Sequence, residues 1–366
     1  MHVSRLSPLL LGCLVLVLAV PLACSSRTAS GGAGTTGGTT APGPTGTGST
    51  LPGGAAEVAI RPAVKPRSTT IDVGMTTPDG RIRTYHLYVP ASLHLAPPTA
   101  ATSTSTVAPA TRVPLLIALH GGLGSGTQFE KQTGFDGLAE ANGFIVAYPY
   151  GWGTGPRHGI ARTWNGGSCC GPAMKQHVDD VTFIKLVIRQ IESRYPVDPR
   201  RVFVAGHSNG GIMAYRLACQ LSGTVAAIGV QSTSLELRPC QPTEPVSLLH
   251  IHGTADKNIP IDGGVGDEGV AQLTFNPPID GVRTLAAANG CQAVPSTSTD
   301  PANADLTIER WASCHPGIDV ELVKVTGAAH AWMGHPAATR RAHPYPKLDS
   351  SSVIWSFLAA HPKPLP

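Results

Sequence analysis

The sequence has few charged residues and no strong excess of either sign. Lys, Arg, Asp and Glu make up 14% of its 366 residues, and the formal net charge is +4. No cluster of Lys and Arg alternates with aromatic residues, so we expect no nucleic-acid partner. No Cys-x-x-Cys pairs with matching His spacing are present either, which argues against a zinc site.

Long apolar runs are confined to the N-terminus. A run over residues 9–20 follows Arg5 and precedes Pro21-Leu22-Ala23, so we predict an export signal over residues 1–23. The run is short for a membrane span. Cys24 follows as in bacterial lipoprotein signals, although Pro21 stands where those signals usually carry Leu. Cys24 is therefore a candidate lipidation site, and a single acyl chain would hold a membrane weakly. We expect an extracellular or cell-envelope protein, with membrane attachment only through this lipid.

Residues 24–66 lack large apolar side chains and are rich in Gly, Thr, Ser and Pro. Such a segment cannot bury enough surface to order itself, so we predict a disordered tether. Residues 67–366 remain, which is enough for one large α/β domain.

Apolar strand patterns alternate with helical patterns through this domain. Residues 69–89 resemble a hairpin, and the continuous apolar run at 114–119 indicates a strand buried on both faces. This alternation predicts an α/β fold with a mostly parallel sheet, whose site lies beyond the carboxyl ends of the strands. Further strands are expected at 144–148, 202–205, 225–231, 246–252 and 320–325, and helices at 129–141, 178–195, 212–218, 282–289 and 351–359.

One segment has the pattern of a nucleophile elbow. Gly206-His207-Ser208-Asn209-Gly210 lies between an apolar strand and a helix, and in a chain with 42 glycines this context matters more than the motif itself. The tight turn and the close approach of strand and helix require glycine on both sides of the serine. We predict that Ser208 is a catalytic nucleophile.

A serine nucleophile needs a histidine base and a carboxylate that orients it, in the chain order Ser, acid, His for this type of turn. Asp256 follows the strand at 246–252, and His330 follows the strand at 320–325. We expect these two residues to complete a triad. The competing candidates are Asp262, Asp319 and His335; His250 and His252 lie within a strand and are expected to be structural.

The developing oxyanion needs backbone donors. We expect one from the amide of Asn209, directly after the nucleophile, and another from Gly122 or Leu123, in the glycine-rich turn after the strand at 114–119. His207, beside the nucleophile, is a candidate pocket residue.

Several motifs lie along the chain in this order: Leu119-His120-Gly121-Gly122, Trp164-Asn165, Cys169-Cys170-Gly171, Val178-Asp179-Asp180-Val181, Gly206 to Gly211, His252 to Asp256, Asn289-Gly290-Cys291 and Gly327 to Trp332. Together they resemble a known group, the secreted esterases of the polyhydroxybutyrate depolymerase and feruloyl/acetylxylan esterase type. The resemblance covers about residues 70–360 and implies a three-layer α/β-hydrolase fold, with Ser208, Asp256 and His330 as its triad. One departure is Gly-Ala-Ala-His-Ala-Trp-Met-Gly at 327–334, where the family usually has Gly-Gly-Gly-His-Thr-Trp-Pro-Gly. Trp164 and Trp332 could line an acyl or aryl pocket, or pack the loops.

Six cysteines follow Cys13 and Cys24, and an even count in an exported chain indicates disulfides, with fifteen possible pairings. The pairing we favour closes two local loops, Cys219 with Cys240 and Cys291 with Cys314. Cys169 and Cys170 would then pair with each other.

These observations predict a secreted serine carboxylic ester hydrolase that needs no cofactor or metal and acts on an ester substrate through an acyl-enzyme. A hydroxyalkanoate polyester or oligomer is the leading substrate, and an acylated plant polysaccharide is the alternative. A hydrolase-fold protein that binds a ligand without catalysis, and a serine peptidase, are the competing functions.

Overall fold

The computed structural model describes residues 68–93, 112–269, 271–334 and 345–364. The predicted export signal, the predicted tether, Cys24 and His335 lie outside these residues. Everything below concerns the part of the chain that the structure describes.

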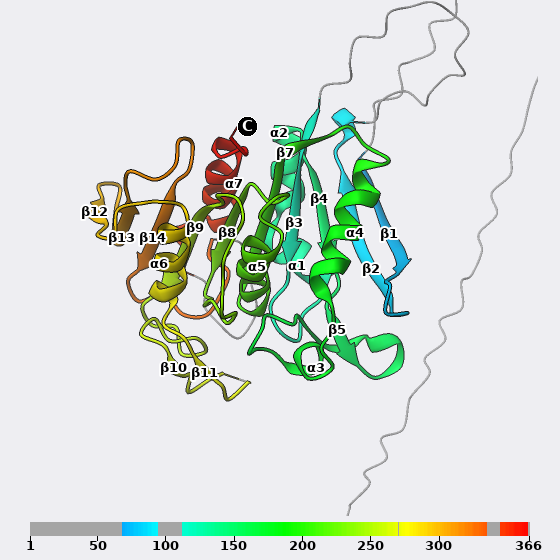
Figure 1. The fold of residues 1–366 in the computed structure, drawn as a ribbon, viewed down its shortest axis with the longest axis horizontal. Helices are drawn as coiled ribbons and strands as arrows, with labels where there is room; N and C mark the ends of the chain where they lie inside the picture. The colour runs from blue at the N-terminus through cyan, green and yellow to red at the C-terminus, as the bar shows by residue number, and fades with distance from the viewer. Residues whose placement is uncertain (1–67, 94–111, 270, 335–344, 365–366) are drawn as a thin grey trace, which may run out of the picture. The chain divides into compact units, whose positions relative to one another are not determined.

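A ten-stranded sheet runs through the domain (Figure 1), in the order β1-β2-β4-β3-β7-β8-β9-β14-β13-β12. The strands from β4 to β14 in this order are parallel, and an antiparallel pair lies at each edge. The predicted mostly parallel sheet is therefore confirmed. Its strands are β1 Thr69–Thr76, β2 Ile82–Val89, β3 Val113–Leu119, β4 Ile145–Pro149, β7 Val197–His207, β8 Ala227–Gln231, β9 Ser247–Gly253, β12 Ser296–Asp300, β13 Asn303–Trp311 and β14 Val320–Val325.

The central strands are buried on both faces, and each face has its own apolar core. In β3, Leu115, Ile117 and Leu119 belong to one core, while Leu116 and Ala118 belong to the other. Helices cover both faces and give three layers (Figure 1). One face is covered by α4 Asp180–Glu192, α5 Asn209–Gln220 and α6 Pro278–Ala288, and the other by α1 Gly126–Thr133, α2 Phe135–Asn142 and α7 Ser350–Ala360.

The strand order reverses direction between β3 and β7. From β3 the chain moves to β4 on one side, and later returns to place β7 on the other side of β3. Ligand sites of open α/β sheets lie at such a switch point, outside the carboxyl ends of the strands. The nucleophile elbow and the turn at Gly121 and Gly122 both lie at this point.

Several details differ from the sequence predictions. The helix expected at 129–141 is two helices, because Gly134 adopts a left-handed conformation (φ 63°) between them. The antiparallel strands β12 and β13 were not predicted, since β12 is polar and mostly exposed and shows no apolar alternation. Shorter elements at the sheet's carboxyl edge were not predicted either: β5 Trp152–Thr154, β6 Ile160–Thr163, α3 Gly171–Lys175, β10 Gly264–Val265 and β11 Thr274–Phe275.

Three disulfides join the cysteines that the structure describes. They pair Cys219 with Cys240, Cys291 with Cys314, and Cys169 with Cys170, which is the set favoured from the sequence. None of the helices described is both long and apolar enough to cross a lipid bilayer.

Candidate active site

Ser208 lies at the apex of a tight turn between β7 and α5. Its φ of 54° is unusual for a residue with a side chain, and the strain places the hydroxyl above the carboxyl edge of the sheet. A side chain at Gly206 would collide with the carbonyl of Gly210, and one at Gly210 with the carbonyls of Leu119 and His120. The two glycines are thus required by close packing of strand, helix and the end of β3.

The structure brings Ser208, His330 and Asp256 together. His330 Nε2 lies 2.9 Å from Ser208 Oγ, and His330 Nδ1 lies 2.8 Å from Asp256 Oδ2. An ionised carboxylate can only accept, so Nδ1–H donates to Asp256 and Nε2 is left free to accept from the serine. This is the tautomer that a general base requires.

Asp256 is held in place by its own turn. Its Oδ1 accepts the amides of Asn258 and Ile259, each at 2.9 Å. Burial raises the pKa of this carboxyl, but the hydrogen bond and charge of His330 and the Ile259 amide outweigh burial and lower the pKa to about 2. Asp256 therefore stays ionised at neutral pH.

A buried row of side chains supports the same turn. Tyr215 Oη donates to His250 Nδ1 (2.8 Å), His250 Nε2 to His252 Nδ1 (3.1 Å), and His252 Nε2 to the carbonyl of Ile259 (2.9 Å). The Ile259 carbonyl can only accept and each neutral ring carries one N–H, so the chain has one direction. Burial lowers the pKa of both histidines, so they are neutral. They are structural residues, as expected from their place in β9.

The turn after β3 carries the proposed oxyanion donors. The Leu123 amide donates to the carbonyl of Arg162 at 2.7 Å, so of the two residues considered we retain Gly122 as the partner of the Asn209 amide. His120 fastens this turn, because its Nδ1 donates to Gly121 O (2.7 Å) and its Nε2 accepts the Gly151 amide (2.9 Å). Burial lowers the pKa of His120 to about 4, so the ring is neutral near pH 7. A neutral ring can donate at Nδ1 and accept at Nε2, as both hydrogen bonds require.

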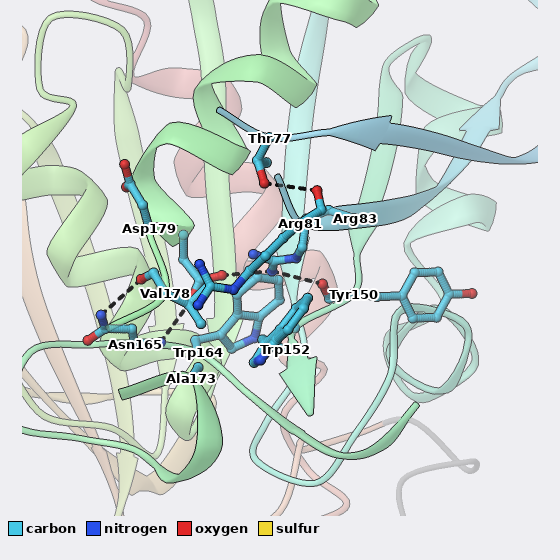
Figure 2. Close-up of polar contacts among 12 residues, drawn as sticks. Thr77, Arg81, Arg83, Tyr150, Trp152, Trp164, Asn165, Ala173, Val178 and Asp179 are labelled. Carbon is cyan, nitrogen blue, oxygen red and sulfur yellow. Dashed lines mark hydrogen bonds and ion pairs between the residues drawn. The ribbon is translucent and has the colours of Figure 1, made fainter. Parts of the chain in front are cut away.

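The Asn209 side chain forms two hydrogen bonds to the backbone of Trp164. Its Oδ1 accepts the Trp164 amide at 2.7 Å and its Nδ2 donates to the Trp164 carbonyl at 3.0 Å. Asn165 then donates its own amide to Asp180 Oδ2 (2.8 Å) and its side chain to Val178 O (2.9 Å), as Figure 2 shows in part. The start of α5 is thereby tied to a second, more remote polar cluster.

An ion pair lies at the centre of that cluster. Arg83 Nη2 lies 2.7 Å from Asp180 Oδ1, with both side chains almost fully buried, and it also reaches the carbonyl of Tyr150 (Figure 2). Asp180 is therefore a buried partner of Arg83 and not a helix cap. The cap of α4 is Asp179, which accepts the Thr182 amide.

Replacing Arg83 with Met is expected to lower the free energy of unfolding by about 3–5 kcal/mol, because it leaves the Asp180 carboxylate buried without its cation. Chemical denaturation measures the change. Arg81→Met is the matched control, since Arg81 pairs with Asp79 near the surface and such pairs contribute about 0–1 kcal/mol. Equal effects of the two replacements would contradict the role assigned to the buried pair.

A cavity of about 440 Å³ opens beside Ser208. Its apolar side comes from Cys170, the α5 residue Ile212, and three residues of the 259–275 segment: Ile259, Leu273 and Phe275. Its polar side comes from Gln128, Gln132, Thr163 and Asn258, and from Lys175 on α3. Sequence reasoning missed these residues, because they come from loops and helices without a recognisable motif.

The prediction that Trp164 and Trp332 line the pocket is wrong. Both side chains are fully buried and neither contacts the cavity. Trp164 donates its indole N–H to the His120 carbonyl, and Trp332 donates to Ser351 and packs edge-on against Phe129. They hold the oxyanion turn and the His330 loop, which is the packing alternative considered from the sequence.

His207 does lie at the cavity. It is buried, its ring is 5.0 Å from that of His330, and its Nε2 has no hydrogen-bond partner among the described residues. Burial and the neighbouring His330 lower the pKa of His207 to about 3, so it adds no positive charge beside the base.

The chain has an α/β-hydrolase fold, with Ser208, His330 and Asp256 in the arrangement of a Ser-His-Asp triad. Residues 98–238 match the family model described as Esterase PHB depolymerase. The chain is 32% identical to feruloyl esterase B of Piromyces equi over 226 residues, which are 60% of this chain and 39% of that protein. The resemblance inferred from the motifs is thereby confirmed.

Two more relatives are similar over a comparable span. One is the bifunctional acetylxylan esterase/xylanase XynS20E of Neocallimastix patriciarum, at 25% identity over 69% of this chain and 31% of that protein. Another is the putative esterase NocK of Nocardia uniformis subsp. tsuyamanensis, at 28% identity over 60% of this chain and 66% of that protein. The chain thus spans less than half the length of the first two relatives. An acetyl xylan esterase from Aspergillus awamori has a TM-score of 0.49 at 18% identity, over 71% of this chain and 94% of that one.

Proposed function

We propose that the protein is a serine carboxylic ester hydrolase that works through an acyl-enzyme. The observation that carries the proposal is the pair of hydrogen bonds, 2.9 and 2.8 Å long, that joins Ser208, His330 and Asp256 at the edge of one cavity. The esterase names of the matched relatives support it.

In this mechanism Ser208 Oγ attacks the ester carbonyl while His330 Nε2 takes its proton. Asp256 stabilises the imidazolium that forms, and the amides of Asn209 and Gly122 stabilise the oxyanion. His330 then returns the proton to the leaving alcohol. Water then attacks the acyl-serine while His330 takes its proton, and His330 returns that proton to Ser208 Oγ as the acid is released.

For the substrate, we propose a hydroxyalkanoate ester, with an acylated plant polysaccharide as the alternative. The description of the matching family model supports the first, and the names of the relatives support the second. We further propose that residues 1–23 direct export, that residues 24–66 form a tether, and that a lipid on Cys24 is the only membrane attachment.

A substrate panel tests this function. Hydroxybutyrate oligomers, methyl ferulate, acetylated xylo-oligosaccharides and p-nitrophenyl acyl esters would be assayed with the purified protein and with Ser208→Ala. We expect hydrolysis of at least one ester class by the wild type only, and the preferred class identifies the substrate. Specific binding of these esters without turnover would instead support the non-catalytic ligand-binding protein, and cleavage of peptide amides the peptidase.

A further inference from the structure

One lysine side chain lines the cavity. Lys175, the last residue of α3, is exposed and lines the cavity, and no Asp or Glu belongs to the same lining. The ion pairs formed between described residues do not include Lys175. Asp179, the nearest carboxylate along the chain, is already used to cap α4. Lys175 is therefore a cationic residue of the cavity lining that forms no ion pair with a described carboxylate.

The chain around Lys175 adds to this positive charge. Residues 141–178 include Arg157, Arg162 and Lys175 but no Asp or Glu. This segment contains β5, β6 and α3. It forms one side of the cavity, with Thr163 and with lining residues between Cys170 and Lys175. This side of the cavity therefore carries charge of one sign, which attracts ligands of the opposite sign. The acidic residues Asp267 and Glu268 belong to the opposite side, next to Gly269, and neither lines the cavity.

The surface next to Lys175 is apolar. Helix α3 begins directly after the paired Cys169 and Cys170, and Cys170 packs with Ile212, Ile259 and Phe275 on the cavity's apolar side. Pro172 and Met174, on α3 itself, also line the cavity. A cation at the end of an apolar surface fits a ligand with an apolar body that ends in an anionic group.

We propose that the preferred substrate is an ester that carries a free carboxylate, which binds Lys175 while the ester carbonyl lies at Ser208. This inference rests on the proposed esterase function and specifies its substrate class. Either the acid half or the alcohol half can carry the carboxylate. If the acid half carries the carboxylate, the substrate is a half-ester of a dicarboxylic acid or an acidic oligoester. If the alcohol half carries it, the substrate is an ester formed at the hydroxyl of a hydroxy acid or a uronic acid.

Matched charged and methyl-capped esters test the proposal. For the acid half the pair is p-nitrophenyl hydrogen glutarate and p-nitrophenyl methyl glutarate. For the alcohol half it is 3-acetoxybenzoate and its methyl ester. Each would be assayed with wild type, Lys175→Met, Lys175→Glu and Lys131→Met. Lys131 is the control, because it is an exposed lysine on α1 that does not line the cavity.

We expect Lys175→Met to lower kcat/KM by about fivefold for the charged member of one pair, and Lys175→Glu to lower it further. The methyl-capped esters should change less than about twofold, and Lys131→Met should change neither. Added salt should reduce the wild-type preference for the charged ester. The pair that responds identifies which half carries the carboxylate.

Equal effects of Lys175→Met on charged and capped esters, or a loss matched by Lys131→Met, would overturn the proposal. The esterase function would stand in that case, because the capped esters would still be hydrolysed. A wild type that hydrolyses no ester of either pair would overturn the esterase function, and the inference with it.

Discussion

The Ser208→Ala and His330→Ala variants are each expected to lower kcat by about 10⁵- to 10⁶-fold, and the double variant no further. Each replacement removes one partner of the 2.9 Å contact that generates the nucleophile, and neither remaining residue acts without the other. The residual rate would come from substrate binding and the oxyanion donors. Steady-state kinetics on the best ester of the panel, with circular dichroism to confirm folding, gives the measurement.

A histidine outside the site is the control for this pair. His315 is exposed on the loop after β13, and His315→Ala should retain wild-type kcat. Multiplicative losses in the double variant would show that Ser208 and His330 act independently. That result would contradict the triad.

Asp256→Asn is expected to lower kcat by about 10⁴-fold with little change in KM. The backbone amides of Asn258 and Ile259 would retain the amide oxygen, so the NH₂ group would face His330 Nδ1. The ring would then accept at Nδ1 and carry its proton on Nε2. No base would remain for Ser208.

The competing acid provides the control for this variant. Asp262 lies exposed, six residues further along the same connection, and Asp262→Asn should leave kcat within about twofold of the wild type, as is usual for surface replacements. A loss below about tenfold in Asp256→Asn would show that Asp256 does not orient the base.

The triad could be predicted because each member lies in the connection just after a strand that the sequence indicates. Each of β7, β9 and β14 contains enough apolar residues to be recognised as a strand, and parallel neighbours place their carboxyl ends at one edge. The elbow motif positions Ser208, and the topology of the sheet brings Asp256 and His330 to it. The prediction of Ser208 used the elbow motif, and the prediction of its two partners used the strand ends and the order of the three residues.

The cavity could not be predicted in the same way. Trp164 and Trp332 were candidates as large aromatics beside the motifs, but indole N–H groups with backbone and hydroxyl partners make them good core residues. Phe275 and Lys175 line the cavity instead, from segments with no periodicity. The buried partnership of Arg83 with Asp180 joins residues 97 positions apart, and no local pattern indicates it.

The most direct test of the account is to label the protein with a fluorophosphonate and map the adduct by peptide mass spectrometry. The account predicts one adduct, on Ser208, that is absent in Ser208→Ala and forms far more slowly in His330→Ala. An adduct on another residue, or labelling of Ser208 that proceeds equally fast without His330, would contradict it.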